Sequence, residues 1–309
     1  MKEFIPVKIT DKKWADKLMQ GEVFMRPLHD FGVWKNHDEN KDKSEKAVLN
    51  NNYRGDILEG TVSVTDDIEH CEFLYGMDPR VKKFVRQVSF VDNYEAQYLK
   101  IYSLYCLKYN PAIDFFDNPD KRMKKFGNTA VIIKDFNSFL RRIAQALVDE
   151  YGDDFLFLMD RVKFFSFHET RTTNPIFEKQ EEYAYQNELR LAFGELEENK
   201  FRIGPVEDGK NMRMIWDLTP KIIQIGDISD IAFEISIDDF LQLNGFLDRK
   251  YIWPCGNENS KTIYDLIVED TRKRIKDFYT PITTPMIQVE DNPEFRQFIA
   301  SRKNKKEQP

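Results

Sequence analysis

Long apolar runs are missing from this sequence. The longest ones, such as residues 155–159, are far shorter than the roughly 20 residues that a membrane-spanning helix needs. Residues 1–17 carry charges where a secretion signal would have an apolar stretch. The sequence therefore predicts a cytoplasmic protein with no membrane partner.

Cysteine and histidine are scarce. The three cysteines, Cys71, Cys106 and Cys255, are odd in number and form no C-x-x-C pair, and none of the four histidines stands at metal-ligand spacing from another. Few, scattered cysteines are typical of a reducing compartment. We expect neither a disulfide framework nor a metal site.

Linker segments are also missing. No stretch rich in proline, glycine and serine divides the 309 residues, although the length alone would allow two domains. Hydrophobic residues make up 41% of the chain, which is enough for a sizeable core. We predict a single elaborated domain over residues 1–309. Its core spans about residues 22–240, followed by a helical segment over about 241–300 and a disordered basic tail over 301–309.

The net charge of −7 gives no general attraction to nucleic acid. Basic stretches at residues 80–86, 121–125 and 302–306 interrupt the acidic background. Such runs are typically solvated surface. A basic patch for a phosphate-bearing partner is the alternative.

Helical and strand patterns are mixed along the chain, which predicts an α+β fold. Helices are expected at 11–20, ending at Gly21, and at 138–151, with Asp135 or Asn137 as the N-cap. Two more are expected at 237–244 and 262–278. Strands are expected at 22–28, 98–109, 129–133, 161–168, 186–193, 221–225 and 231–237.

The strand at 186–193 is the most informative segment. Its side chains alternate, so that Gln186, Glu188 and Arg190 share one face while the apolar residues at 189, 191 and 193 enter the core. An ordinary half-buried surface strand has the same pattern. An amide, a carboxylate and an arginine that can pair with it on one face favour a functional site.

Gln186-x-Glu188 at the head of a strand resembles the Q/E-x-E element of the Arg-Ser-Glu class of ADP-ribosyltransferases. Residues 23–26 resemble the first strand of that class, which carries an NAD-holding arginine. The class has Ser-Thr-Ser on its middle strand, where this chain offers Ser103 and Cys106. The resemblance implies two packed mixed or antiparallel sheets flanked by helices, with NAD as a substrate.

A wider resemblance covers roughly residues 22–240. The run of Phe177, Lys179, Tyr183, Gln186, Glu188 and Arg190 is similar to a group of uncharacterised bacterial proteins, some found beside defence or toxin genes. This resemblance implies a toxin or an antiphage-defence protein.

The resemblance implies a catalytic role for Glu188, which would stabilise the positive charge that forms on the ribose as nicotinamide departs. Gln186 would orient the acceptor. Arg26 would hold the pyrophosphate through its planar guanidinium. The alternative for Arg26 is an ion pair with a structural carboxylate, and Arg190 is expected to fix Glu188 rather than touch the substrate.

Three more residues are expected to hold NAD. Tyr183 could stack on the nicotinamide, or belong to the core with its hydroxyl at the surface. Ser103 would contact the nicotinamide side. Arg54, with Asp56 and Glu59, could close a lid over the site, the alternative being a capped turn.

We therefore expect an NAD-dependent ADP-ribosyltransferase toxin that modifies a macromolecular acceptor, either nucleic acid or protein. An antitoxin protein would be a further partner. One alternative is a defence-associated sensor without chemistry. Another is a metal-dependent nuclease that uses Asp56, Glu59 and Glu188.

Overall fold

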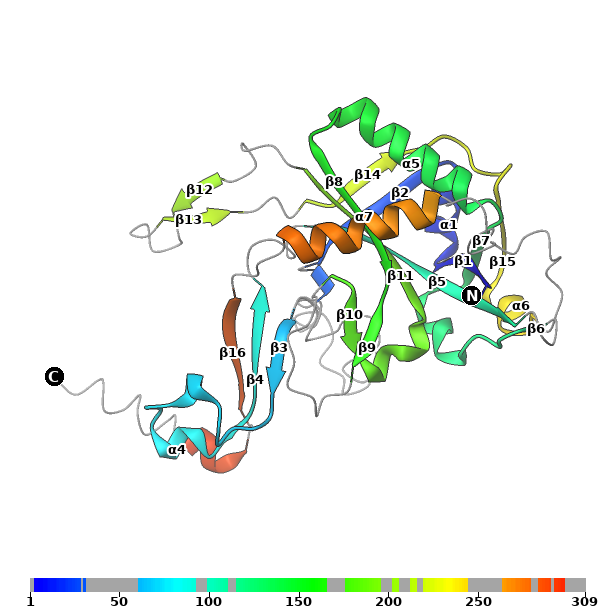
Figure 1. The fold of residues 1–309 in the computed structure, drawn as a ribbon. Helices are drawn as coiled ribbons and strands as arrows, with labels where there is room; N and C mark the ends of the chain where they lie inside the picture. The colour runs from blue at the N-terminus through cyan, green and yellow to red at the C-terminus, as the bar shows by residue number, and fades with distance from the viewer. Residues whose placement is uncertain are drawn as a thin grey trace.

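A computed structural model describes residues 3–28, 30–31, 61–92, 99–110, 115–165, 176–195, 202–205, 212–215, 219–243, 263–278, 283–289 and 292–297. A large antiparallel sheet with helices packed against it forms the centre of the molecule (Figure 1). The α+β class is confirmed. No helix within these ranges is long and apolar enough to cross a membrane.

Nine strands make up the large sheet. They are β1 (Glu3–Thr10), β2 (Glu22–Pro27), β5 (Lys100–Asn110), β6 (Phe115–Phe116), β7 (Thr129–Ile133), β8 (Phe155–Arg161), β11 (Glu188–Glu195), β14 (Lys221–Gln224) and β15 (Ala232–Ser236). The order is β14-β2-β5-β1-β7-β15. In addition, β11 and β6 pair with β5, and β8 pairs with β11. All but one of the strands expected to form two packed sheets thus belong to a single sheet, the exception being the strand expected at 161–168.

Strand β5 is shared by four neighbours, and two of them occupy the same edge. Strand β1 pairs with its second half, from Val7 opposite Tyr105 onward, whereas β2 pairs only at its start, with Arg26 opposite Ile101. Between these two registers, residues 102–104 of β5 face neither strand. The sheet is therefore split at this edge, and helix α1 (Lys12–Met19) connects the two strands that part there.

Three helices cover one face of the sheet. They are α1, α5 (Phe136–Tyr151) and α7 (Ile263–Phe278), and they share the largest hydrophobic core (Figure 1). Asp135 is the N-cap of α5, because its carboxylate accepts from the Ser138 backbone N–H at 2.9 Å. Strand β8 holds α7 through an ion pair between Asp160 and Arg272 at 2.7 Å. The predicted helices at 11–20, 138–151 and 262–278 are confirmed.

Shorter elements lie elsewhere on the sheet. Helix α6 (Ile237–Leu241) and the 3₁₀ helix η2 (Lys121–Phe126) pack on a second core with β1, and η3 (Glu181–Gln186) precedes β11. Strands β9 (Lys163–Phe165) and β10 (Glu178–Gln180) form a parallel pair. Strands β12 (Arg202–Pro205) and β13 (Met212–Ile215) form an antiparallel pair.

A separate three-stranded sheet consists of β3 (Thr61–Thr65), β4 (Val85–Asp92) and β16 (Thr283–Val289) (Figure 1). The 3₁₀ helix η1 (Glu72–Leu74) and helix α4 (Pro79–Lys82) connect β3 to β4, and a small cluster around Leu74 and Val88 packs beneath them. Strand β16 corrects the expectation of a helical segment over 241–300, because a distant strand, β4, supplies its hydrogen-bond partners.

Two strand boundaries also differ from expectation. The predicted strand at 161–168 is divided, since Val162 lies between β8 and β9 and its backbone N–H donates to the Glu188 carbonyl at 2.9 Å. Gln186 ends η3 instead of opening β11. Asn187, at φ 39°, turns the chain in a left-handed conformation, so the strand begins at Glu188.

The close approach of two backbone segments explains why a glycine stands at position 21, at the end of the turn after α1. A Cβ at Gly21 would lie 2.1 Å from the Gly226 carbonyl oxygen, and its φ is +93°. The Ile225 backbone N–H donates to the Gly21 carbonyl at 3.0 Å. Residues 225–230 are thus a turn between β14 and β15 that is fixed to the end of α1.

Candidate functional site

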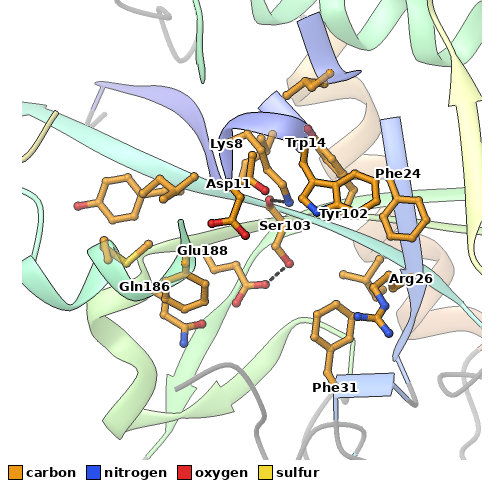
Figure 2. Close-up of a pocket in the computed structure, with 18 of the residues that line it drawn as sticks. Lys8, Asp11, Trp14, Phe24, Arg26, Phe31, Tyr102, Ser103, Gln186 and Glu188 are labelled. Atoms are coloured by element: carbon orange, nitrogen blue, oxygen red, sulfur yellow. Dashed lines mark hydrogen bonds between the residues drawn. The ribbon is translucent and has the colours of Figure 1, made fainter. Parts of the chain in front are cut away.

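A cavity of about 360 Å³ opens where β1 and β2 part along β5. This volume falls within the range of small-molecule sites, roughly 300–1,000 Å³. Three polar side chains, Arg26 of β2, Ser103 of β5 and Glu188 of β11, line it from three neighbouring strands. Figure 2 shows Arg26 and Glu188 towards opposite ends of the pocket, with Ser103 between them.

Glu188 is buried, with 5% of its surface exposed, and both carboxylate oxygens accept hydrogen bonds. Oε1 accepts from Ser103 Oγ at 2.5 Å and from Arg190 Nε at 2.8 Å. Oε2 accepts from Lys179 Nζ at 3.0 Å. The carboxylate is therefore fixed in position by donors from β5, β10 and its own strand.

The balance of charges keeps Glu188 ionised. Burial by itself raises the pKa of Glu188, but the positive charges of Arg190 and Lys179 and the hydrogen bonds from Arg190 and Ser103 outweigh it. The net result is a pKa well below the usual range of a glutamate. The pocket consequently presents a permanent anion next to Ser103.

Arg190 is buried more deeply than any polar neighbour, at 1% exposure. Besides Glu188, its guanidinium donates to the Ile176 carbonyl at 2.7 Å, so it links β11 to the chain segment before β10. It is absent from the pocket lining, and its position agrees with the expected role of fixing Glu188. Glu188 and Arg190, on the polar face of β11, are thus buried, with Lys179 of β10 and the Ile176 carbonyl as hydrogen-bond partners.

Lys179 joins the two predicted catalytic side chains. Its ammonium donates to Gln186 Oε1 and to Glu188 Oε2, both at 3.0 Å, and it lies 5.6 Å from the centre of the Tyr183 ring. Gln186 is buried at 7% exposure. Its carbonyl oxygen is therefore oriented by Lys179 rather than left free for a ligand.

Arg26 lies at the other end of the pocket and is more accessible. Its guanidinium pairs with the Asp30 carboxylate at 3.0 Å, and the two side chains are 32% and 25% exposed. Phe31 lines the pocket beside it (Figure 2). Arg26 thus has the ion pair that was one of its two expected roles, while it also faces the cavity.

Lys8 of β1 occupies the split in the sheet. Its ammonium donates to the Ser103 backbone carbonyl at 2.9 Å, in the part of β5 that faces neither β1 nor β2, and lies 4.2 Å from the centre of the Tyr102 ring. Burial lowers the pKa of Lys8 to about 8, although the Glu188 charge opposes this shift. Lys8 therefore replaces a missing strand partner of β5.

No similarity to a known protein identifies the chain. A scan against protein-family models finds no match, and searches of curated proteins and of solved structures find none either.

The structure brings five of the six predicted site residues into one pocket: Arg26, Ser103, Tyr183, Gln186 and Glu188. Arg54, the sixth, lies outside the described residues, as do Asp56 and Glu59. Cys106 points away from the pocket into the core at 0% exposure. Within the described ranges, no group of three histidine, cysteine or acidic side chains could hold a metal ion.

Several pocket residues were missed by sequence reasoning. Lys8 and Asp11 lie on or just after β1, a strand that the patterns did not predict, and Trp14 lies on α1. Trp14 stacks on Phe24, with 5.6 Å between the ring centres and 16° between the ring planes, and the two rings form an aromatic wall of the pocket. The alternation of residues 4–9 was the only available signal, and a single lysine within it does not indicate a site.

Proposed function

We propose that this protein is an NAD-dependent ADP-ribosyltransferase. The observation that carries the proposal is the set of Arg26, Ser103 and Glu188 along one pocket, from three neighbouring strands with the serine strand in the middle. The same three residue types in the same roles define the class that the sequence resembles.

Glu188 suits the chemistry of this reaction. When nicotinamide leaves the ribose of NAD, positive charge develops at the anomeric carbon, and a nearby fixed anion stabilises it. Ser103, Lys179 and Arg190 hold the Glu188 carboxylate in place before any substrate arrives. Little reorganisation is then needed at the moment of bond cleavage.

Arg26 suits the pyrophosphate of the same substrate. A guanidinium binds phosphate oxygens in a planar, two-pronged arrangement. Because Asp30 occupies one side of it, binding would require Arg26 to share or exchange this partner. Tyr183 lines the pocket and is half-buried, so its ring is available to the nicotinamide end.

The acceptor in this proposal is a macromolecule, either nucleic acid or protein, modified in the cytoplasm. Helix η2 supports an acceptor with phosphates, because Met123 and Phe126 line the pocket while the basic residues beside them are exposed. In the proposed role the protein is a toxin of a toxin–antitoxin or antiphage-defence system, with an ADP-ribosyltransferase fold and an antitoxin as its partner.

The test is NAD consumption by the purified protein in the presence of cell lysate. Released nicotinamide is quantified by chromatography, and transferred ADP-ribose is detected on protein and nucleic acid separately with a labelled NAD. We expect nicotinamide release with matching covalent label. No release above that of lysate alone would reject the proposed function.

One observation favours a second candidate, a sensor that binds a ligand without chemistry. Both oxygens of Glu188 already accept hydrogen bonds from side chains, which is also what a purely structural carboxylate would do. Saturable NAD binding by calorimetry without any nicotinamide release would favour this candidate.

A further inference from the structure

Asp11 is a second carboxylate on the pocket. It stands at the N-cap of α1 and lines the cavity, yet its side chain makes no capping hydrogen bond. Within the described residues the Asp11 carboxylate has no hydrogen bond or ion pair, and only the backbone carbonyl of Asp11 accepts hydrogen bonds, from the first turn of α1. Figure 2 shows its carboxylate near Ser103 and Glu188, towards the end of the pocket that lies away from Arg26.

Another residue takes over the capping that Asp11 does not perform. Aspartate is favoured at the N-cap because its oxygen accepts from the first free backbone N–H groups of the helix. Here Asn128 Oδ1 accepts from the Lys12 backbone N–H at 2.9 Å. The Asn128 backbone carbonyl accepts from the Ile237 backbone N–H at 2.9 Å, so the residue that supplies this external cap is fixed.

Gly127 allows the external cap to reach the helix. A Cβ at this position would lie 2.0 Å from the Thr10 carbonyl carbon and 2.5 Å from the Asp11 nitrogen, which no side chain tolerates. The turn at 127–128 therefore packs directly against the backbone at 10–11. It fixes the position of Asp11 and leaves its carboxylate free for the pocket.

We propose that Asp11 is the general base that takes the proton of the attacking acceptor hydroxyl or water. This inference rests on the proposed ADP-ribosyl transfer. With Glu188 beside the ribose and Arg26 at the pyrophosphate, Asp11 lies at the end of the pocket where an acceptor would enter. Asp11 thus takes the place on the acceptor side that was expected of Gln186, which is buried and bonded to Lys179.

The step balances without a further reactant. The bond between the anomeric carbon and the nicotinamide nitrogen breaks, and its electron pair neutralises the pyridinium, so that neutral nicotinamide leaves. The acceptor oxygen forms a new bond to the anomeric carbon. Its proton passes to the Asp11 carboxylate, while Glu188 remains ionised throughout.

Asp11→Asn and Asp11→Ala test the assignment, with Asp16→Asn as the matched control. Asp16 lies on the same helix and pairs with Lys12 outside the pocket. General base catalysis is typically worth 10²–10⁴-fold, so both Asp11 variants should lose about 100-fold or more in nicotinamide release. NAD affinity and melting temperature should stay close to wild type for both variants, because the Asp11 side chain makes no capping hydrogen bond that they could lose and Asn128 still accepts from the Lys12 backbone N–H.

Chemical rescue separates a proton acceptor from a merely structural group. Added formate should restore part of the rate of Asp11→Ala, since a small carboxylate can occupy the vacated space, and should leave Glu188→Gln inactive. Three outcomes would overturn the assignment: near wild-type turnover of Asp11→Asn, a loss confined to NAD affinity, or an absence of rescue. If wild type and Asp16→Asn both fail to consume NAD, the proposed function itself fails and this step falls with it.

Discussion

The two ends of the pocket are built differently. At the Glu188 end, the pocket is lined by Ser103, Lys179, Gln186 and Glu188, and Arg190 binds Glu188 from outside the lining. Every one of these side chains except that of Ser103 is at least nine-tenths buried. At the Arg26 end, comprising Arg26, Asp30 and Phe31, the charged pair is a quarter to a third exposed. One end resembles a protein core, and the other resembles a surface.

This difference indicates separate roles for the two ends of the pocket. Buried, fully hydrogen-bonded charges cannot easily rearrange, which suits stabilisation of a charge that develops during reaction. A half-exposed ion pair contributes little to stability and can exchange partners, which suits the binding of an incoming anion. The comparison predicts that stability and activity are coupled at the Glu188 end and separable at the Arg26 end.

Glu188→Gln has the largest expected effect. Loss of the negative charge should reduce nicotinamide release by about 100-fold or more, the usual consequence of losing such a group. The buried ammonium of Lys179 and the buried guanidinium of Arg190 would then lose the charge of Glu188, and breaking a buried pair in this way costs about 3 kcal/mol or more. Enzyme assays and urea unfolding measure the two effects.

Glu182→Gln, an exposed carboxylate on η3, is the matched control and should change neither quantity. Wild-type turnover by Glu188→Gln would reduce Glu188 to the structural partner of Arg190. An unchanged free energy of unfolding would contradict the comparison between the two ends.

Arg26→Ala should separate binding from stability. We expect NAD affinity to fall roughly tenfold or more, because hydrogen bonds to charged groups are worth about 1.5–3 kcal/mol. The free energy of unfolding should change by less than about 1 kcal/mol, since the ion pair with Asp30 is partly exposed. Calorimetric titration with NAD and urea unfolding provide both values.

Asp30→Asn tests this result further, because it removes the carboxylate that pairs with Arg26. Affinity for NAD should stay the same or rise by a few fold. If both variants instead lower stability equally and leave NAD affinity unchanged, Arg26 serves only its ion pair.

Lys8 has the smallest expected effect, which depends on pH. Its pKa in the folded protein is about 8, below the ordinary value of 10.5, so the unfolded chain binds more protons between these values. The cost of burying the charged ammonium is present in full below about pH 8 and disappears as the pH rises towards 10.5. The wild type should therefore gain stability relative to Lys8→Met over this interval.

Urea unfolding of both proteins at pH 7, 8.5 and 10 measures the gain. Lys163→Met, at an exposed position of β9, corrects for the general loss of one positive charge. A stability difference that stays constant from pH 7 to pH 10 would show that Lys8 is charged throughout.

Local sequence patterns were sufficient to predict the elements whose caps or side-chain alternation lie within the element itself. Helix α5 begins at a capping aspartate and ends before a glycine, and β11 alternates between apolar and polar side chains. The pairing of Glu188 with Arg190 follows from their spacing of two on one strand. These features depend on neighbours within a few residues, which is the range at which sequence patterns act.

Other parts of the site depend on partners far away in the chain. The sequence predicted that Gln186, Glu188 and Arg190 lie on one face, but it could not tell whether that face meets solvent. In the structure all three side chains are buried, and Gln186 belongs to η3 instead of the strand. Strand β16 was missed for a related reason, since its hydrogen bonds go to β4, about two hundred residues earlier.

Side-chain type and strand alternation are local properties, so the amino-acid sequence alone was enough to indicate Gln186, Glu188 and Arg190 as candidate site residues. The placement of Arg26, Ser103 and Glu188 on one pocket, and the capping of α1 by Asn128 in place of Asp11, depend on the tertiary structure. Antiparallel pairing sets β2, β5 and β11 beside one another across more than 160 residues, and no local pattern records which strands pair.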